Sequence, residues 1–186
     1  LNTVVITFNP HTMSVLNKNK NNILTTHNKK IELLSENLID YIVTINFNKE
    51  FSKISHTSFI DKMIQKYNPN IFLVGYDNRF GFKGKGDYKF LTDYLKDTPI
   101  NVISYDVYKN SDKIIKSSLI RKMILNGQVS NISNYLGRFY SISGKIIKGY
   151  QKGRGLGFPT ANLELHDNEQ IIPKEGVYSV NFKIDG

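Results

Sequence analysis

Apolar positions follow two patterns along the first two thirds of the chain. Four apolar runs predict strands at residues 2–8, 41–45, 71–75 and 101–107. The first two are expected to be buried, residues 2–8 on both faces, because that run is continuous and rich in β-branched residues. Apolar residues at helical spacing predict helices at residues 27–38, 58–67, 87–95 and 118–125. Strands that alternate with helices favour a parallel sheet with helical crossovers. In such sheets ligands gather at the carboxyl ends of the strands.

The pattern changes after Gln128. A short helical segment ends at Gly137, and no helical period follows Leu136. The remaining residues have strand composition, with glycine or proline between the runs, at residues 140–150, 157–165 and 176–184. This predicts a second, all-β unit that begins near Gly137.

Composition and charge narrow the class of protein. Hydrophobic residues make up 40% and charged residues 22% of the 186 residues, as in globular proteins. The chain has no cysteine, which excludes disulfides and thiolate chemistry. It has no apolar run of membrane-helix length and no signal-peptide pattern, so a cytoplasmic protein is expected. The net charge of +9 is spread along the chain, and a general bias toward Lys and Asn is the favoured explanation of it. Polyphosphate substrates or weak nucleic-acid attraction would also fit this charge.

Three segments follow predicted strands at the edge of the sheet where a ligand is expected. One is the segment after the fourth strand, and the other two contain candidate ligand contacts. The first, GYDNRFGFKGKGD at residues 75–87, has the glycines and lysines of a loop that holds an anion, although solvated turns share this composition. The second, NPHT, contains His11, for which the residues alone favour a turn role over a ligand contact.

The segment KSSLIR precedes and opens the fourth predicted helix. Ser117 and Ser118 are natural N-caps, because their hydroxyls accept bonds from the first free N–H groups. The same helix end could instead bind phosphate, with Arg121 one turn further in for a bidentate contact. The residues alone favour capping.

The glycines and cations in the first part of the segment GYQKGRGLGFPTAN, which spans residues 149–162, predict a flexible cationic flap. Directly after the flap, Thr160 and Asn162 offer oxygen atoms suited to Mg²⁺, a hard cation that prefers oxygen ligands and substrate phosphates. A glycine-rich hairpin turn is the simpler alternative, but it does not account for the PTAN residues beside it.

With these motifs together, the chain resembles the prokaryotic bifunctional FAD synthetases, in which a riboflavin kinase is fused to an FMN adenylyltransferase. The matching motifs, in order, are FNPH (8–11), GYDNRFG (75–81), KSSLIR (116–121), LGRFY (136–140), GRGLGFPTAN (153–162) and PKEGVY (173–178). The resemblance implies a Rossmann-like α/β nucleotidylyltransferase domain with a parallel sheet over residues 1–135. A partial all-β riboflavin kinase barrel would follow over residues 136–186.

The resemblance also implies substrates and site residues. The substrates would be riboflavin, FMN and ATP, with Mg²⁺ as the metal. The flavin site of the first module would include His11, Asp77, Arg79 and Phe80. ATP would contact Ser117, Ser118 and Arg121 in the first module, and Gly149, Gly153, Arg154, Gly155, Leu156 and Thr160 in the second. Arg121 and Asn162 would be catalytic, and Thr160 with Asn162 would hold the metal.

Several positions depart from the family pattern. Lys116, Ser118, Asn78 and Phe139 stand where the family has serine, threonine, an aromatic residue and proline. The family's histidine–x–glycine–histidine signature and the catalytic glutamate of its kinase are not among the 186 residues, and both ends of the chain look cut. We therefore expect an incomplete piece of the enzyme that completes neither reaction efficiently by itself.

Two other functions stay open. One is a nucleotidylyltransferase with another substrate, which fits SSLIR but not the flap. The other is a basic β-barrel that binds nucleic acid, for which Tyr140 and Tyr150 beside Lys145 and Lys148 give slight support. Under the main interpretation the partners are small molecules, with no nucleic acid, no membrane and at most a weak homo-oligomer.

Overall fold

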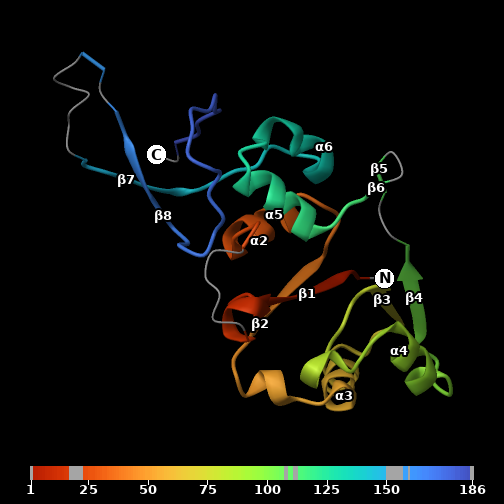
Figure 1. Ribbon diagram of the computed structural model, residues 1–186. Coiled ribbons are helices and arrows are strands. Elements are labelled where there is room, and N and C mark those ends of the chain that lie inside the picture. The colour runs from red at the N-terminus through yellow and green to blue at the C-terminus, as the bar shows by residue number, and fades with distance from the viewer. Residues whose placement is uncertain are drawn as a thin grey trace. The chain divides into compact units, whose positions relative to one another are not determined.

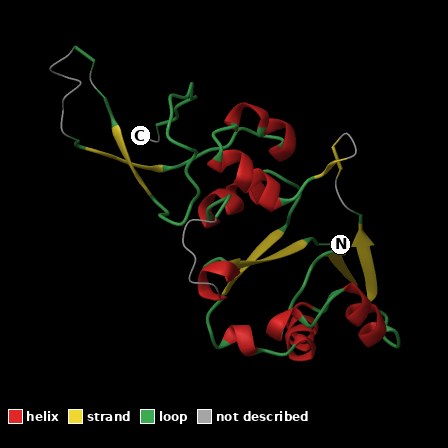
Figure 2. Ribbon diagram, viewed as in Figure 1, coloured by secondary structure: helices red, strands yellow, loops and turns green. Residues whose placement is uncertain are grey.

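The computed structural model describes residues 2–16, 23–106, 109–110, 113–149, 157–158 and 160–184. The chain forms two compact units (Figures 1 and 2). The first comprises Leu1–Asn19 and Lys30–Ile114, and the second Lys20–Lys29 and Ile115–Gly186. Each unit has its own cluster of buried apolar residues. Within the described residues, each helix is either too short or too polar to cross a bilayer.

The strands of the first unit pair in parallel. β1 (Val4–Asn9) pairs with β2 (Tyr41–Asn46), and β3 (Ile71–Gly75) pairs with β4 (Asn101–Tyr105). A short antiparallel pair, β5 (Lys109–Asn110) with β6 (Lys113–Ile114), comes at the end of the unit. The other elements are α1 (Thr12–Leu16), η1 (Phe51–Lys53), α3 (His56–Tyr67), η2 (Phe82–Gly84) and α4 (Tyr88–Leu95). The helix α2 (His27–Ser35) contributes residues to both units.

Helices α3 and α4 cover one face of the β3–β4 pair (Figure 1). Each begins at a side-chain cap: the Ser58 N–H donates to Ser55 Oγ over 3.0 Å, and the Phe90 N–H donates to Asp87 Oδ1 over 2.8 Å. The buried residues of these helices pack against alternate residues of the strands, as a period of two requires. These core residues are Ile60, Leu91 and Leu95, with Phe72, Val74 and Val102 from the strands.

The other face of this pair is open. Leu73 is 65% exposed and Ile103 46% exposed. Burial on both faces was predicted for residues 2–8, and this prediction was wrong: within β1 only Thr7 is buried, and Val4 is 40% exposed. The described parallel strands of the first unit form two separate pairs, β1–β2 and β3–β4, in place of one continuous sheet.

Most predicted elements of the first unit occur within a few residues of the expected bounds. The helix α2 is shorter than predicted, because it ends at Ser35 and leaves Leu38 98% exposed. The strand β4 ends at Tyr105, and residue 107 of the predicted strand lies outside the described part.

The second unit combines short helices with one antiparallel strand pair. Its helical elements are α5 (Ser117–Leu125), η3 (Val129–Asn131) and α6 (Ser133–Leu136), and its strands are β7 (Gly144–Ile147) and β8 (Asn162–Leu165). Gly127 and Gly137 follow the ends of α5 and α6 at φ of +75° and +67°, in the left-handed region that favours glycine.

The core of the second unit joins segments far apart in the chain. It contains Ile120, Met123 and Ile124 of α5 together with Ile132 and Ile171, which are all nearly or fully buried. Ile23 forms a bridge with Gln170, and Leu24 packs against the same core. The Tyr140 hydroxyl donates to the Ile171 carbonyl over 2.6 Å and so fixes the segment beyond β8.

The strand predicted at residues 176–184 is absent from the described structure. Val177, Val180, Phe182 and Ile184 are 62–103% exposed. The prediction was wrong because apolar alternation is not sufficient for a strand. A strand also needs a neighbouring strand to pair with, and residues 176–184 pair with none of the described strands.

Candidate functional site

His11 lies between β1 and α1 in the first unit. Its Nδ1 accepts the Met13 N–H over 3.2 Å, and its carbonyl accepts the Ser14 N–H over 2.9 Å. The imidazole therefore satisfies a backbone donor at the start of a short helix, which agrees with the turn role that the residues alone favour. The half-exposed ring also leaves His11 at the carboxyl end of β1, where a ligand is expected.

The loop at residues 75–87 is closed by its own bonds. Phe80 and Gly86 exchange two backbone hydrogen bonds of 3.0 and 2.9 Å, and the Asn78 N–H donates to the Gly75 carbonyl over 3.0 Å. Arg79 reaches Asp87 at 3.5 Å between Nη1 and Oδ2, an ion pair that joins the two arms of the loop. The loop thus has a defined shape, with Asp77 and the Arg79 side chain exposed.

Close packing explains two glycines of this loop. Gly81 has a φ of +71°, and a Cβ built there would lie 2.4 Å from the His56 Cα. A Cβ at Gly86 would lie 2.3 Å from the Phe80 ring. The sequence suggested an anion-binding role for these glycines, but backbone conformation and packing are enough to require them.

A row of aromatic rings joins the segment after β1 to the loop at residues 75–87. Phe8 at the end of β1 contacts Phe51, which contacts Phe59, which in turn contacts Phe80 of the loop, with centroid distances of 6.0, 6.1 and 5.9 Å. Phe80 also packs on Phe90, at 6.1 Å. Of this row, only Phe80 was predicted to line the flavin site, although Phe8 also begins a matched motif. The others could not be found by spacing, because they come from four separate elements and loops.

The predicted triphosphate residues open α5 in the second unit. Ser117 and Ser118 are the first residues of the helix, and Lys116 is its N-cap residue without a capping side-chain bond. The capping prediction is therefore wrong, because the helix begins one residue earlier than expected and the serines fall inside it. Arg121 lies one turn in, and partial burial lowers the pKa of its guanidinium from its ordinary value.

The structure brings Gly149 and Asn162 of the second motif together. A Cβ at Gly149 would lie 1.7 Å from Asn162 Nδ2, so a larger residue there would displace the Asn162 side chain. Asn162 opens β8 opposite Ile147, and Thr160 is exposed just before it. Gly153, Arg154, Gly155 and Leu156 lie outside the described residues.

The side-chain oxygen atoms of Thr160 and Asn162 could supply two of the oxygen ligands in the coordination shell of Mg²⁺. Both are neutral oxygen donors on an exposed segment, which leaves the remaining positions to phosphates and water. The described residues contain no group of three or more His, Asp or Glu side chains that could hold a metal.

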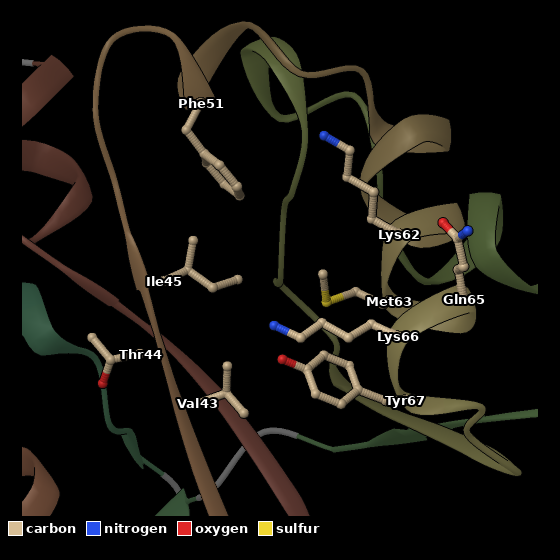
Figure 3. Close-up of a pocket in the computed structure, with 9 residues that line it drawn as sticks. All are labelled: Val43, Thr44, Ile45, Phe51, Lys62, Met63, Gln65, Lys66 and Tyr67. Atoms are coloured by element: carbon tan, nitrogen blue, oxygen red, sulfur yellow. The ribbon is translucent and has the colours of Figure 1, made fainter.

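A hollow of about 450 Å³ in the first unit contains none of the predicted site residues (Figure 3). It lies between β2 and α3, with η1 at one side. Its lining residues are Val43, Thr44, Ile45, Phe51, Lys62, Met63, Gln65, Lys66 and Tyr67.

Two family profiles match consecutive parts of the chain. FAD synthetase matches residues 1–119, and riboflavin kinase matches residues 136–186. A protein of Buchnera aphidicola (subspecies Schizaphis graminum) named bifunctional riboflavin kinase/FMN adenylyltransferase is 40% identical over 96% of this chain. Relatives of the same name from Bacillus subtilis and Listeria monocytogenes are 35% and 32% identical over the whole chain.

The chain spans 57–59% of the length of these three relatives. A solved structure titled as a macrolide-efflux protein from Streptococcus pneumoniae superposes with a TM-score of 0.82 at 27% identity. That superposition covers 96% of this chain and 58% of the other.

Proposed function

Because the chain belongs to the FAD synthetase family, we propose that it acts in FAD biosynthesis. The proposed enzyme is a transferase that phosphorylates riboflavin to FMN and then transfers the adenylyl group of ATP to FMN. The observation that carries this proposal is the succession of the two profiles, FAD synthetase before riboflavin kinase, on one chain. The alternative of a nucleic-acid-binding barrel accounts for neither match.

The finer architecture is part of the proposal. The two parallel pairs of the first unit would belong to one Rossmann-like sheet, and β7 with β8 to a riboflavin kinase barrel. The proposed modules meet between Tyr135 and Leu136. The compact units divide differently, because α5 and α6 pack in the second unit.

For adenylyl transfer, the proposed flavin site contains His11, Asp77, Arg79 and Phe80. The row of aromatic rings supports this assignment, because Phe80 is held between Phe59 and Phe90 at the edge of the loop. Aromatic rings of this kind suit a flat heteroaromatic ligand. The exposed Asp77 and Arg79 would then face the polar groups of the flavin or the phosphate.

The triphosphate of ATP would bind at the first turn of α5. Lys116 makes no capping bond, so the first N–H groups of this nine-residue helix lack a side-chain acceptor from the N-cap residue. Ser117, Ser118 and Arg121 add two hydroxyls and a guanidinium near the same turn. Their role is to align the α-phosphorus with the FMN phosphate and to offset the charge that develops there.

For phosphoryl transfer, residues 149–156 would cover ATP, with ATP contacts from Gly149, Gly153, Arg154, Gly155, Leu156 and Thr160. Thr160 and Asn162 would hold Mg²⁺, which when bound neutralises phosphate charge. The close approach of Gly149 to Asn162 supports a shared site, because it joins the start of the flap to a proposed metal ligand. The partners under this proposal are small molecules.

Quenching of FMN fluorescence by the chain in the presence of Mg-ATP tests the proposal. We expect saturable quenching that weakens about tenfold when Arg79→Ala removes a charged contact. Lys96→Ala, in an exposed ion pair with Asp97 outside the loop, is the matched control and should bind like the parent chain. An absence of quenching, combined with salt-dependent binding of single-stranded DNA, would favour the nucleic-acid alternative.

A further inference from the structure

The hollow between β2 and α3 has the properties of a second ligand site. We propose that it binds a small organic anion with a flat, apolar body, whose charged group is held by Lys62 and Lys66. No residue assigned to flavin, ATP or metal lines this hollow. The proposal is therefore independent of the function proposed above.

The walls of the hollow are mainly apolar. Val43 and Ile45 lie on the same face of β2, because side chains two residues apart point to one side of a strand. Met63, which is 7% exposed, and the Phe51 ring complete this surface. Figure 3 shows these side chains directed into the space between β2 and α3. A flat apolar ligand would bury such walls from water.

The charged side of the hollow comes from one helix. Lys62 and Lys66 are four residues apart on α3, so they lie on the same face. Figure 3 shows both side chains reaching from α3 toward β2, with the Tyr67 hydroxyl on the same side. Lys66 Nζ lies 5.4 Å from the centroid of the Tyr67 ring, which positions the ammonium group beside the phenol.

These two lysines have no carboxylate partner in the ion pairs of the described residues. The ion pairs of the described residues include Arg79–Asp87, Lys89–Asp93 and Lys96–Asp97, and none of these involves Lys62 or Lys66. Two like charges four residues apart on a helix repel each other, which is unfavourable for the free protein. An anion between them would remove this repulsion and receive two charge-assisted hydrogen bonds.

The size of the hollow defines the class of ligand. A volume of about 450 Å³ lies within the range of small-molecule sites. It has room for a ligand of two or three fused rings with one carboxylate, sulfonate or phosphate. Apolar walls with cations along one side favour such a ligand over an inorganic ion.

Titration of the full chain with naphthalene sulfonate, followed by two-dimensional amide NMR spectra, tests this site. We expect saturable shifts confined to residues 43–45, 51 and 62–67. The double variant Lys62→Gln/Lys66→Gln should weaken binding about tenfold or more, because two charged hydrogen bonds are lost. Neutral naphthalene should bind more weakly than the sulfonate to the parent chain and equally to both proteins.

The matched control is Lys49→Gln/Lys53→Gln. These exposed lysines have the same spacing, belong to the same unit and do not line the hollow. This control should keep the affinity of the parent chain. If both double variants lose the same affinity for naphthalene sulfonate, the binding depends on the general positive charge of the chain, and the proposal is wrong. Unchanged binding after Lys62→Gln/Lys66→Gln, or displacement of the probe by a single-stranded oligonucleotide, would also overturn it.

Discussion

Single residues in the loop at residues 75–87 are constrained by backbone geometry more than by ligand chemistry. Gly81 and Gly84 both have positive φ, of +71° and +63°. Their surroundings differ, because a Cβ at Gly81 meets the His56 backbone, whereas a Cβ at Gly84 meets only the Arg79 side chain at 3.2 Å. Alanine at Gly84 would therefore test the cost of the left-handed backbone conformation, whereas alanine at Gly81 would add a steric clash with the His56 backbone.

Gly81→Ala should destabilise the first unit much more than Gly84→Ala. The left-handed conformation costs an alanine roughly 1–2 kcal/mol at either position. Only Gly81→Ala adds a clash with rigid backbone, so we expect this variant to lower the free energy of unfolding by more than about 3 kcal/mol. Urea unfolding of both variants measures the difference. Equal losses would show that the approach to His56 relaxes without cost.

Lys30 gives the first unit a specific pH dependence. Its ammonium is part-buried and donates to Thr7 Oγ1 over 3.0 Å, and desolvation by burial lowers its pKa below 10.5. Between the folded-state pKa and 10.5 the unfolded chain binds more protons than the folded chain. The contribution of Lys30 to stability is thus fully present above pH 10.5 and is lost as pH falls through the folded-state pKa.

Lys30→Met should remove this dependence. We expect the stability difference between the parent chain and Lys30→Met to change in favour of the parent chain as pH rises from about 8 toward 10.5. Urea midpoints at several pH values measure it, with the exposed Lys53→Met as control. If the stability difference between the parent chain and Lys30→Met stays constant with pH, this would contradict a lowered pKa of Lys30 in the folded chain.

At the scale of elements, the N-cap residue of α5, Lys116, makes no capping hydrogen bond with its side chain. Lys116→Ser should supply a hydroxyl to the first turn and raise the free energy of unfolding of the second unit by about 1 kcal/mol. Lys122→Ser, in the last turn of the same helix, is the control and should lower stability slightly, because it removes a favourable charge from the C-terminal end. Denaturant unfolding followed by helical circular dichroism measures both. A decrease for Lys116→Ser would contradict the assigned helix start.

Much of the element order could be predicted from apolar periodicity. The strands β1, β2 and β3 and the helices α3, α4 and α5 begin or end within about two residues of the expected positions, because their buried residues produce the pattern. Residues 176–184 carry a similar pattern without a strand, because strand pairing depends on a neighbour that local sequence does not specify.

The candidate site was predictable only in part. Gly149 and Asn162 are adjacent, as a shared motif suggests, and His11 follows β1. The hollow at Lys62 and Lys66 was not predicted, since these residues look like the solvated face of an amphipathic helix. The aromatic row also depends on contacts between distant segments.

At the scale of the whole chain, each unit has a core that can be tested separately. Leu91 is 1% exposed in the first core, and Ile124 is 0% exposed in the second. Leu91→Ala and Ile124→Ala should each cost about 3 kcal/mol through lost burial and a cavity. Because the cores are distinct, we expect each variant to destabilise mainly its own unit.

Hydrogen exchange followed by mass spectrometry measures this separation. Leu91→Ala should accelerate exchange in α3 and α4, and Ile124→Ala in α5 and α6. Similar acceleration of all four helices by either variant would show that the two cores unfold as one cooperative body.

The pairing of Ile23 with Gln170 has a consequence for synthesis. A chain emerges from the ribosome from its N-terminal end, and domains generally fold as units during this process. The residues of the first unit have all been made once Ile114 is added, whereas Ile23 and Leu24 need Gln170 and Ile171 for their contacts. These early apolar residues are therefore made well before the residues that cover them, and until Gln170 and Ile171 are added they can pack against wrong partners.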